Sequence, residues 1–294
     1  MAGSNNLKIK AYGKLNLTLD ISGIRNDGYH LLETVMQSVS VYDLLEFERS
    51  SGSGIELICE KEGFPLNEKN LIWKAVDAFF DYCSMKKEDK ITVKITKNLP
   101  SMAGMAGGSA DCAAALAAMN AMYDTKLTHK EICEIGVKLG ADVPFCITGG
   151  TGLCRGIGEK ITKLPSPNCF FVVVQPDLSI STPEAFKKYD KIKEPEHCNT
   201  AEFLKNLENG NLSEMCRNMF NVLEYACDSE EIAKVKRQLT ESGAITAIMT
   251  GSGSAVYGVF PNKPEAEKAL EKLGEYRFKD ICRPMNIPYE ILQT

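Results

Sequence analysis

The chain has 294 residues, of which 44% are hydrophobic and 25% charged, and its formal net charge is −5. That length suits one large domain or two ordinary ones, and the composition is typical of a globular protein. Because the chain has no strongly basic segment, we do not expect it to bind nucleic acid through a charged face. A negative net charge is still compatible with a local basic pocket that binds a nucleotide.

The cysteines and the apolar runs indicate a cytoplasmic protein. The 11 cysteines are scattered without a Cys-x-x-Cys pair, and the three histidines are not clustered, which argues against a zinc site and a disulfide framework. No signal peptide is visible at the polar N-terminus, and the longest apolar run, near 169–174, is too short to span a bilayer. We therefore expect reduced thiols and no membrane partner.

Residues 7–21 alternate between apolar and polar side chains, which predicts a half-buried strand. Lys14 and Asn16 belong to the polar set and therefore project from the same face. From this segment alone, a solvated polar face is the favoured interpretation. The apolar face carries Leu15, Leu17, Leu19 and Ile21, and the polar face carries Lys14, Asn16, Thr18 and Asp20.

An Asp27-Gly28 pair then predicts a hairpin turn, with Tyr29 and His30 just beyond it. An aromatic residue beside a histidine can stack on a base and hydrogen-bond to it, although the start of a strand is the commoner interpretation. The strand continues over 31–48. Apolar residues at helical spacing over 70–83 predict a core-packing helix with Asn70 as its N-cap.

A glycine-rich loop at 98–110 lies between an alternating strand at 91–95 and an alanine-rich helical segment that reaches Met122. Glycines let backbone N–H groups converge, and a helix start adds partial positive charge, so this order favours phosphate binding. The loop lacks the Gly-Lys-Ser/Thr ending of a P-loop and the strict Gly-x-Gly-x-x-Gly of a dinucleotide fold. The alternative is a tight turn that packs a small-residue helix against a sheet.

A capping box at 128–131 predicts a helix that ends at Gly140. Val143-Pro144 then predicts extended backbone, because the residue before a proline disfavours the α region. Asp142 is thereby placed in a short bend after the helix. An aspartate in a loop is usually a turn former or a solvated charge, but one aimed at a phosphate loop is a candidate base.

Pro165-Ser166-Pro167 is the clearest boundary signal in the chain, so we divide it into domains 1–164 and 165–294. Beyond the boundary we expect a small antiparallel sheet covered by helices. The expected strands are 170–175, 244–249, 255–260 and 281–287. One expected helix starts within 181–184 with Pro183 at its first helical position, and the others lie within 201–242 and at 264–273.

Taken together, these motifs resemble those of the GHMP kinase superfamily, over nearly the whole chain. The set is Lys14-Leu15-Asn16, Asp27-Gly28-Tyr29-His30, Asn70-Leu71-Ile72, the loop 100–110, Leu139-Gly140-Ala141-Asp142-Val143-Pro144 and Thr250-Gly251-Ser252-Gly253. The resemblance implies an α+β kinase of two domains, the first ribosomal-protein-S5-domain-2-like and the second ferredoxin-like, with the active site in the cleft between them.

The resemblance also implies a reaction. The Asp-Gly-Tyr-His and Gly-Ala-Asp-Val-Pro motifs are similar to those of the branch with a cytidyl substrate. This branch transfers the γ-phosphoryl group of ATP to the 2-hydroxyl of methylerythritol linked to cytidine diphosphate, giving the 2-phosphate and ADP in the non-mevalonate isoprenoid pathway. Mg²⁺ is expected with ATP, with Ser109 as a weak candidate ligand. The expected partner is this small molecule, and the expected state is a monomer or weak homodimer.

Site residues follow from the same resemblance. Asp142 is implied to be the base, with Lys14 beside it and the reacting hydroxyl. Cytosine is implied to stack between Tyr29 and Phe186, with His30 on the base edge. The implied ATP-binding residues are Asn70, Leu71, Pro100, Ser101, Met102, Ala103, Gly104, Met105, Ala106, Gly107, Gly108, Ser109 and Ala110. The implied substrate-binding residues are Asn16, Tyr29, His30, Thr182, Phe186, Gly251, Ser252 and Gly253.

The loop departs from the family pattern at three positions. Ala103 and Ala106 stand where many members have glycine, and Ala110 stands where many have a second serine, so a hydroxyl contact is absent there. Two other functions are kept open. One is another small-molecule kinase of the superfamily, such as a homoserine or mevalonate kinase. The other is a nucleotide-binding protein without catalysis, which the presence of Lys14 and Asp142 argues against.

Overall fold

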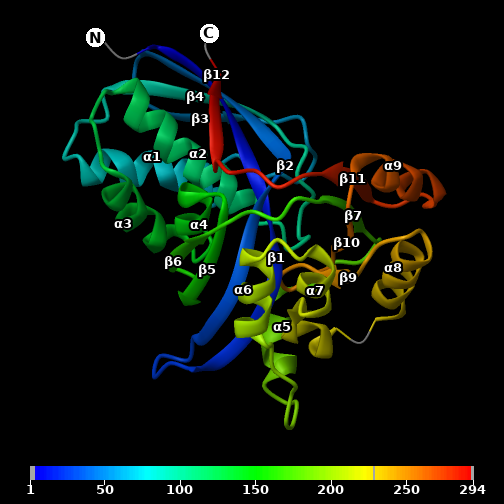
Figure 1. Cartoon of the computed structure of the whole chain (residues 1–294). Helices are drawn as coiled ribbons and strands as arrows, with labels where there is room; N and C mark the ends of the chain where they lie inside the picture. The colour runs from blue at the N-terminus through cyan, green and yellow to red at the C-terminus, as the bar shows by residue number, and fades with distance from the viewer. Residues whose placement is uncertain (1–3, 228, 293–294) are drawn as a thin grey trace.

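The computed structural model describes residues 4–227 and 229–292, which form two β-sheets with helices packed on them (Figure 1). The first half contains β1 (Asn6–Ile24), β2 (His30–Ser51), β3 (Gly54–Ile58), α1 (Leu71–Tyr82), β4 (Asp89–Thr96), α2 (Gly107–Met122), α3 (His129–Leu139), α4 (Val143–Thr148), β5 (Thr151–Gly156) and β6 (Lys160–Leu164). The second half contains β7 (Phe170–Gln175), α5 (Thr182–Tyr189), α6 (Thr200–Glu208), α7 (Leu212–Arg217), β8 (Phe220–Asn221), the 3-10 helix η1 (Val222–Ala226), α8 (Glu230–Glu241), β9 (Ala247–Met249), β10 (Val256–Phe260), α9 (Lys263–Lys272), β11 (Phe278–Cys282) and β12 (Tyr289–Leu292).

The long hairpin of β1 and β2 runs through the whole molecule (Figure 1). The Arg25 N–H donates to the Tyr29 carbonyl at 2.7 Å and Gly28 has φ +87°, which confirms the predicted turn. The expectation of a solvated polar face on β1 is wrong, because Lys14 is 4% exposed and Asn16 1%. The glycine loop and the turn after β9 cover that face, and both hydrogen-bond to these two residues.

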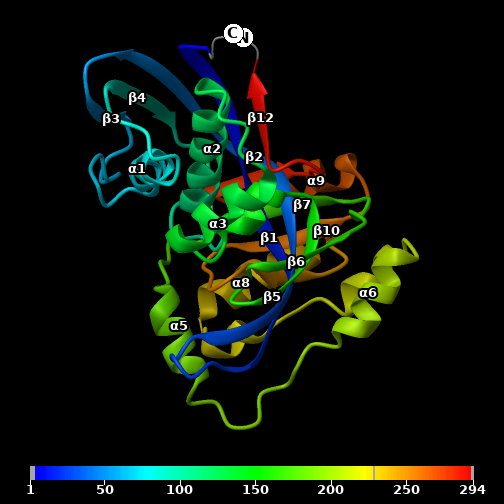
Figure 2. The same ribbon diagram turned by 90° about the vertical axis from the view of Figure 1, so that its left-hand side faces the viewer.

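Helix α2 forms the centre of the first unit. It packs against β1 and β2 on one side and is surrounded by α1, α3 and α4 (Figure 2). Its alanines make this possible, because small side chains allow neighbouring elements to approach from several directions. The helix is therefore buried over most of its length, including both Ala114 and Ala118 at 0% exposure. A buried helix of this kind holds its N-terminus in a fixed place.

The second sheet has the order β11-β7-β10-β9 and is antiparallel throughout, as predicted. Helices α8 and α9 pack on it. In contrast, the expected last strand at 281–287 is wrong: β11 ends at Cys282, and β12 begins only at Tyr289. Pro284 and Pro288 lie between them, and proline cannot donate a ladder hydrogen bond.

Strand β12 does not stay with the second sheet but pairs antiparallel with β1 in the first. The short β8 also pairs with β1. The first sheet thus has the path β12-β1-β2-β4-β3, with β5 on β2 and β6 on β5. A boundary after Leu164 separates most of the two sheets, but residues 220–221 and 289–292 cross back over it. The α+β class is confirmed.

The 11 cysteines of the sequence are all free thiols. Across the described ranges, each helix is either too short or too polar to cross a membrane.

Candidate active site

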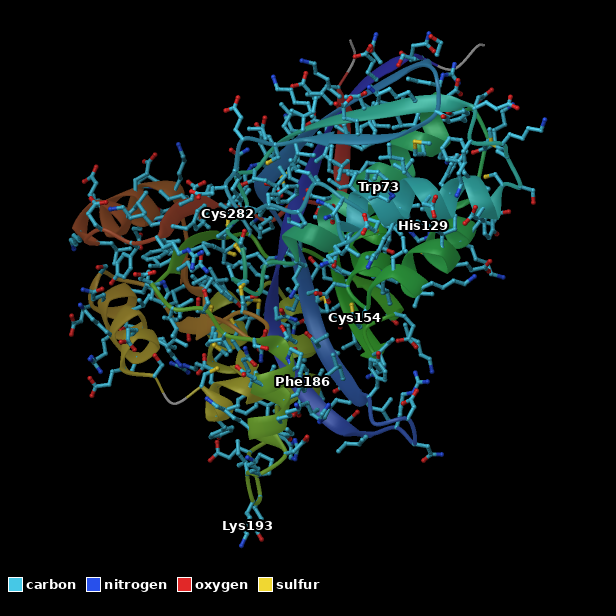
Figure 3. The ribbon with its side chains drawn as sticks, turned by 180° about the vertical axis from the view of Figure 1, so that it is seen from behind. Trp73, His129, Cys154, Phe186, Lys193 and Cys282 are labelled. Carbon is cyan, nitrogen blue, oxygen red and sulfur yellow. The ribbon has the colours of Figure 1, made fainter. Side chains whose placement is uncertain are left out.

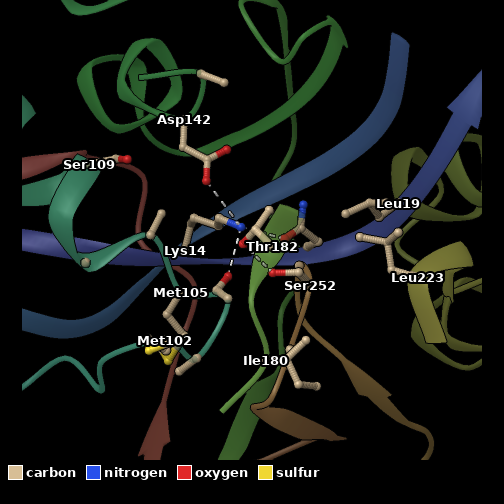
Figure 4. A pocket seen from close by; sticks show the side chains of 18 of the residues that line it. Lys14, Leu19, Met102, Met105, Ser109, Asp142, Ile180, Thr182, Leu223 and Ser252 are labelled. Carbon is tan, nitrogen blue, oxygen red and sulfur yellow. Dashed lines mark hydrogen bonds and ion pairs between the residues drawn. The ribbon is translucent and has the colours of Figure 1, made fainter. Parts of the chain in front are cut away.

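A pocket of about 620 Å³ lies where the two sheets meet (Figure 4). One wall comes from β1 with Lys14 and Asn16, and another from the loop 100–109, of which every residue except Ser101 lines the pocket. Asp142, the start of α5 and the turn 251–253 complete it. The pocket therefore gathers the phosphate loop, the candidate base and residues from the second half of the chain.

Lys14 is held at the centre of this pocket. Its Nζ donates to Asn16 Oδ1 at 2.6 Å and to the Gly104 carbonyl at 2.9 Å, and it lies 3.7 Å from Asp142 Oδ2 (Figure 4). Register shifts in the β1–β2 ladder occur on both sides of Lys14 and Asn16, between Tyr12 and Lys14 and between Asn16 and Thr18. Such bulges re-aim side chains out of a regular strand. The positive charge is thus fixed between the glycine loop and a carboxylate.

Asp142 occupies the N-cap position of α4, with φ −81° and ψ −12°. The prediction of extended backbone at Val143-Pro144 is wrong, because these residues begin α4. Proline is tolerated in a first helical turn, where its missing N–H is not needed. Within the described chain the Asp142 side chain makes no capping hydrogen bond, so its carboxylate faces the pocket with 34% side-chain exposure.

The glycine loop adopts left-handed backbone at Met102, Gly104 and Ala106, with φ values of +54°, +73° and +56°. A Cβ on Gly104 would lie 2.0 Å from the Thr250 carbonyl oxygen, so only glycine fits there. This close approach joins the loop to the turn that follows β9. For Ala106, left-handed backbone costs roughly 1–2 kcal/mol.

The first turn of α2 is arranged for an anion. Its N-cap residue is Ala106, whose methyl group cannot accept a hydrogen bond from the helix. Gly107, Gly108 and Ser109 line the pocket, so their backbone N–H groups and the positive end of the helix are directed to it. Ala110 is 2% exposed and does not line the pocket, so the missing hydroxyl leaves no gap in this wall.

The second half of the chain supplies the opposite wall. Thr182 Oγ1 lies 2.7 Å from Ser252 Oγ, and both side chains line the pocket with Gly251 and Gly253. Leu19, Ile180 and Leu223 also line the pocket (Figure 4), which adds apolar surface beside these hydroxyls. This mixture suits a ligand with both polar and apolar parts.

Phe186 lines the pocket, but Tyr29 does not and is 62% exposed. The Phe186 ring stacks on His30, with centroids 4.7 Å apart and planes at 29° (Figure 3 marks Phe186 beside β2). His30 Nε2 is also 2.7 Å from Asp190 Oδ1. In this conformation the partner of Phe186 is therefore His30, and the stacking of cytosine between Tyr29 and Phe186 stays a prediction.

Asn70 is the N-cap of α1, as predicted. Its Oδ1 accepts from the Ile72 N–H at 2.8 Å, and its Nδ2 donates to the Pro65 carbonyl at 2.7 Å. The residue is 6% exposed and does not line the pocket. Leu71 lies close to the loop, with its Cδ1 3.6 Å from a Cβ placed on Gly108. The adenine-binding role of both residues stays a prediction.

Three residues that hold the site in place were not predicted. The Thr250 hydroxyl accepts from the Asn16 N–H at 3.0 Å, and Tyr257 OH donates to the Asn16 carbonyl at 2.7 Å. The Asn221 amide donates to the carbonyls of Met249 and Gly251, at 2.8 Å each. Only Thr250 had a sequence signal, since it adjoins the Gly-Ser-Gly turn.

Within 4–227 and 229–292, no group of three or more His, Cys, Asp or Glu side chains could hold a metal ion. The oxygen donors that line the pocket include the Ser109 hydroxyl and the Asp142 carboxylate. These hard ligands suit Mg²⁺, which commonly takes only one or two protein ligands and completes its shell with phosphate oxygens and water.

Two family models match the chain. The GHMP kinases N terminal domain matches residues 70–150, and the GHMP kinases C terminal domain matches residues 203–279. A curated protein of Clostridium tetani, 4-diphosphocytidyl-2-C-methyl-D-erythritol kinase, is 42% identical over 270 residues, which cover 91% of this chain and 95% of the relative.

Solved structures give the same result. A crystal structure of 4-(cytidine 5'-diphospho)-2C-methyl-D-erythritol kinase superposes with a TM-score of 0.76 at 28% identity, covering 90% of this chain and 94% of that one. Homoserine kinase from Cytophaga hutchinsonii superposes with a TM-score of 0.78 at 18% identity, covering 98% of both chains, which shows a shared fold. The predicted two-domain kinase fold is therefore confirmed, and the chain belongs to the GHMP kinase family.

Proposed function

We propose that the protein transfers the γ-phosphoryl group of ATP to the 2-hydroxyl of 4-diphosphocytidyl-2-C-methyl-D-erythritol, giving the 2-phosphate and ADP. The observation that carries this proposal is the position of Lys14 Nζ, 3.7 Å from Asp142 Oδ2 and bonded to the phosphate loop through Gly104. The relative from Clostridium tetani with this activity in its name matches nearly the whole chain at 42% identity.

In this reaction the substrate hydroxyl gives its proton to the Asp142 carboxylate. The freed oxygen forms the new bond to the γ-phosphorus, while the bond from that phosphorus to the β–γ bridging oxygen breaks and ADP leaves. Lys14 stabilises negative charge on the attacking oxygen and on the phosphoryl group. Such a reaction asks the protein mainly for positioning and charge stabilisation.

The N–H groups at 107–109 bind the phosphates of ATP, supported by the positive end of α2. Mg²⁺, which we expect with ATP, would neutralise phosphate charge, and the Ser109 hydroxyl in the pocket wall would hold it. The fixed bond between Lys14 and the Gly104 carbonyl keeps the loop and the ammonium in register. The phosphates of ATP and the catalytic base Asp142 are thereby aligned by one connected set of residues.

The other end of the substrate lies against the second half of the chain. Asn16, Thr182 and Ser252 offer polar contacts, and the cytosine stacks on Phe186, with Tyr29 on its other side and His30 on the base edge. Because His30 stacks on the Phe186 ring in this structure, a base that stacks on the same face of Phe186 takes the place of His30. Base–aromatic stacking is worth about 1–3 kcal/mol per base.

The test is ATP consumption with 4-diphosphocytidyl-2-C-methyl-D-erythritol, with homoserine, mevalonate and galactose as controls. Turnover with the cytidyl compound alone supports the proposal. Turnover with a control assigns the protein to another branch of the family, whose fold it shares with homoserine kinase. ATP binding without turnover of any compound would favour a non-catalytic nucleotide-binding protein.

We also propose that the protein works in the cytoplasm as a monomer or weak homodimer. The scattered free thiols support a reducing compartment, since disulfides form and persist in oxidising ones. Size-exclusion chromatography with light scattering tests the oligomeric state, and a tight dimer at low micromolar concentration would contradict it.

A further inference from the structure

A buried cluster of three charged side chains lies behind the glycine loop. Lys97, just after β4, donates through its Nζ to Asp43 in β2 and, at 2.7 Å, to Asp111 Oδ2 in α2. The exposures of these side chains are 5%, 0% and 2%. None of the three lines the large pocket, so the reaction described above does not use them directly.

The cluster joins both ends of the loop. At the entrance, Asp43 Oδ1 accepts from the backbone N–H groups of Asn98 and Leu99, at 2.7 and 2.8 Å. At the exit, Asp111 belongs to the second turn of α2, two residues after Ser109, which lines the pocket. One ammonium group therefore connects the strand before the loop to the helix after it.

The cluster also lies directly beneath the phosphate-binding turn. A Cβ placed on Gly107 would be 3.5 Å from Lys97 Nζ and 3.7 Å from Asp43 Oδ2. Gly107 itself lines the pocket on its other side. A change in the position of Lys97 or Asp43 would therefore shift the N–H groups that face the nucleotide.

Stability is a poor explanation for such a cluster. Replacing a buried ionic group with apolar side chains of similar volume is often neutral or stabilising. Here two carboxylates share one ammonium, and Asp111 Oδ1 has no hydrogen-bond partner within the described chain. The arrangement therefore carries a folding cost that a purely structural site would avoid.

We propose that Lys97, Asp43 and Asp111 are positioning residues, which hold the glycine loop in its ATP-binding shape. This rests on the proposed function only in that the loop binds ATP. The cluster acts through the backbone of the loop and not by touching the nucleotide. Loss of the tether is therefore expected to weaken ATP binding while leaving the binding of the alcohol substrate intact.

Two variants separate positioning from stability. Lys97→Met removes the tether and leaves two buried carboxyl groups without their cation, so both the melting temperature and the ATP affinity fall. Lys97→Met/Asp111→Asn keeps the tether broken but replaces one of those carboxyl groups with a neutral amide, so the melting temperature recovers. If the cluster positions the loop, ATP affinity stays low in the double variant. Asp280→Asn, a change of the same kind at an exposed aspartate in β11 outside the pocket, is the control.

The measurement is the Kd for ATP by equilibrium titration, with melting temperatures and the KM for the alcohol alongside. We expect the Kd for ATP to rise about tenfold or more in both Lys97 variants, the effect of losing one charge-assisted hydrogen bond. The KM for the alcohol should stay within about twofold of the wild-type value, because the contacts that bind the alcohol are unchanged.

Two outcomes would overturn the proposal. One is a Lys97→Met protein with a lower melting temperature and an unchanged Kd for ATP. The other is a double variant in which stability and ATP affinity recover together. Because the titration needs no alcohol, failure of wild type to phosphorylate the cytidyl compound would reject the proposed function without affecting this test.

Discussion

Asp142→Asn gives the most direct test of the mechanism. The asparagine amide has the size of the Asp142 carboxylate but cannot take the proton of the substrate hydroxyl. General-base catalysis typically raises a reaction rate by about 10²–10⁴-fold. We therefore expect kcat to fall by that factor, which is roughly 3–5 kcal/mol of barrier. Lys14 keeps its bonds to Asn16 and Gly104, so the pocket stays formed.

The structure also predicts what this variant leaves unchanged. Asp142 makes no capping bond in the described chain and is 34% exposed, so its stability effect should stay within about 0.5 kcal/mol. The Kd for ATP should change little, since the phosphates are bound by the loop. Steady-state kinetics, ATP titration and thermal melting measure these three quantities. A folded Asp142→Asn protein that keeps more than a tenth of wild-type kcat would refute the assignment of Asp142 as base.

Three other substitutions test separate parts of the structure. Phe186→Ala should raise the substrate KM about 5- to 100-fold with little change in kcat, because stacking acts in ground and transition states alike; an unchanged KM would reject the stacking role. Ala106→Gly should raise the free energy of unfolding by about 1 kcal/mol in urea titrations, because it relieves left-handed backbone at φ +56°. Asn70→Ala should lower that free energy by about 1 kcal/mol through the lost cap; a raised KM for ATP as well would support its predicted adenine contact, and an unchanged KM would argue against it.

One pH effect belongs with these predictions. Burial raises the pKa of Asp111 to about 7 from its ordinary 3.8, with Lys97 opposing the shift and Asp43 adding to it. An unfolded chain loses this proton near pH 4, whereas the folded chain keeps it to about pH 7, so this carboxyl makes stability fall as the pH rises through that range. Urea unfolding at pH 5 and pH 8 should show a smaller difference for Asp111→Asn than for wild type. An equal difference would contradict the raised pKa.

Local patterns in the sequence predicted much of this architecture. The Asp27-Gly28 turn, the cap at Asn70 and the capping box of α3 are confirmed, because each depends on residues within a few positions of one another. The pairing of Lys14 with Asn16 also followed from the two-residue period of a strand. These features are determined by neighbours along the chain.

Features that depend on distant contacts were missed. The polar face of β1 is buried because the glycine loop and the turn after β9 cover it, and that turn lies more than 200 positions away. Likewise, the pairing of β12 with β1 cannot be predicted from the local pattern over 281–287. Asn221 and Tyr257 hold the site through backbone atoms of other elements, and no local pattern identifies such residues.

These distant contacts explain why the lysine can serve the chemistry at all. Lys14 is held by the carbonyl of Gly104, and Gly104 reaches that position only because it lies against the Thr250 carbonyl without a side chain between them. Thr250 in turn hydrogen-bonds to Asn16, which accepts from Lys14. The glycine loop, the lysine and the turn of the second sheet therefore form a closed circuit of contacts. A substitution at any one of them should affect both nucleotide binding and the placement of Lys14 beside Asp142. Effects within such a network are not additive.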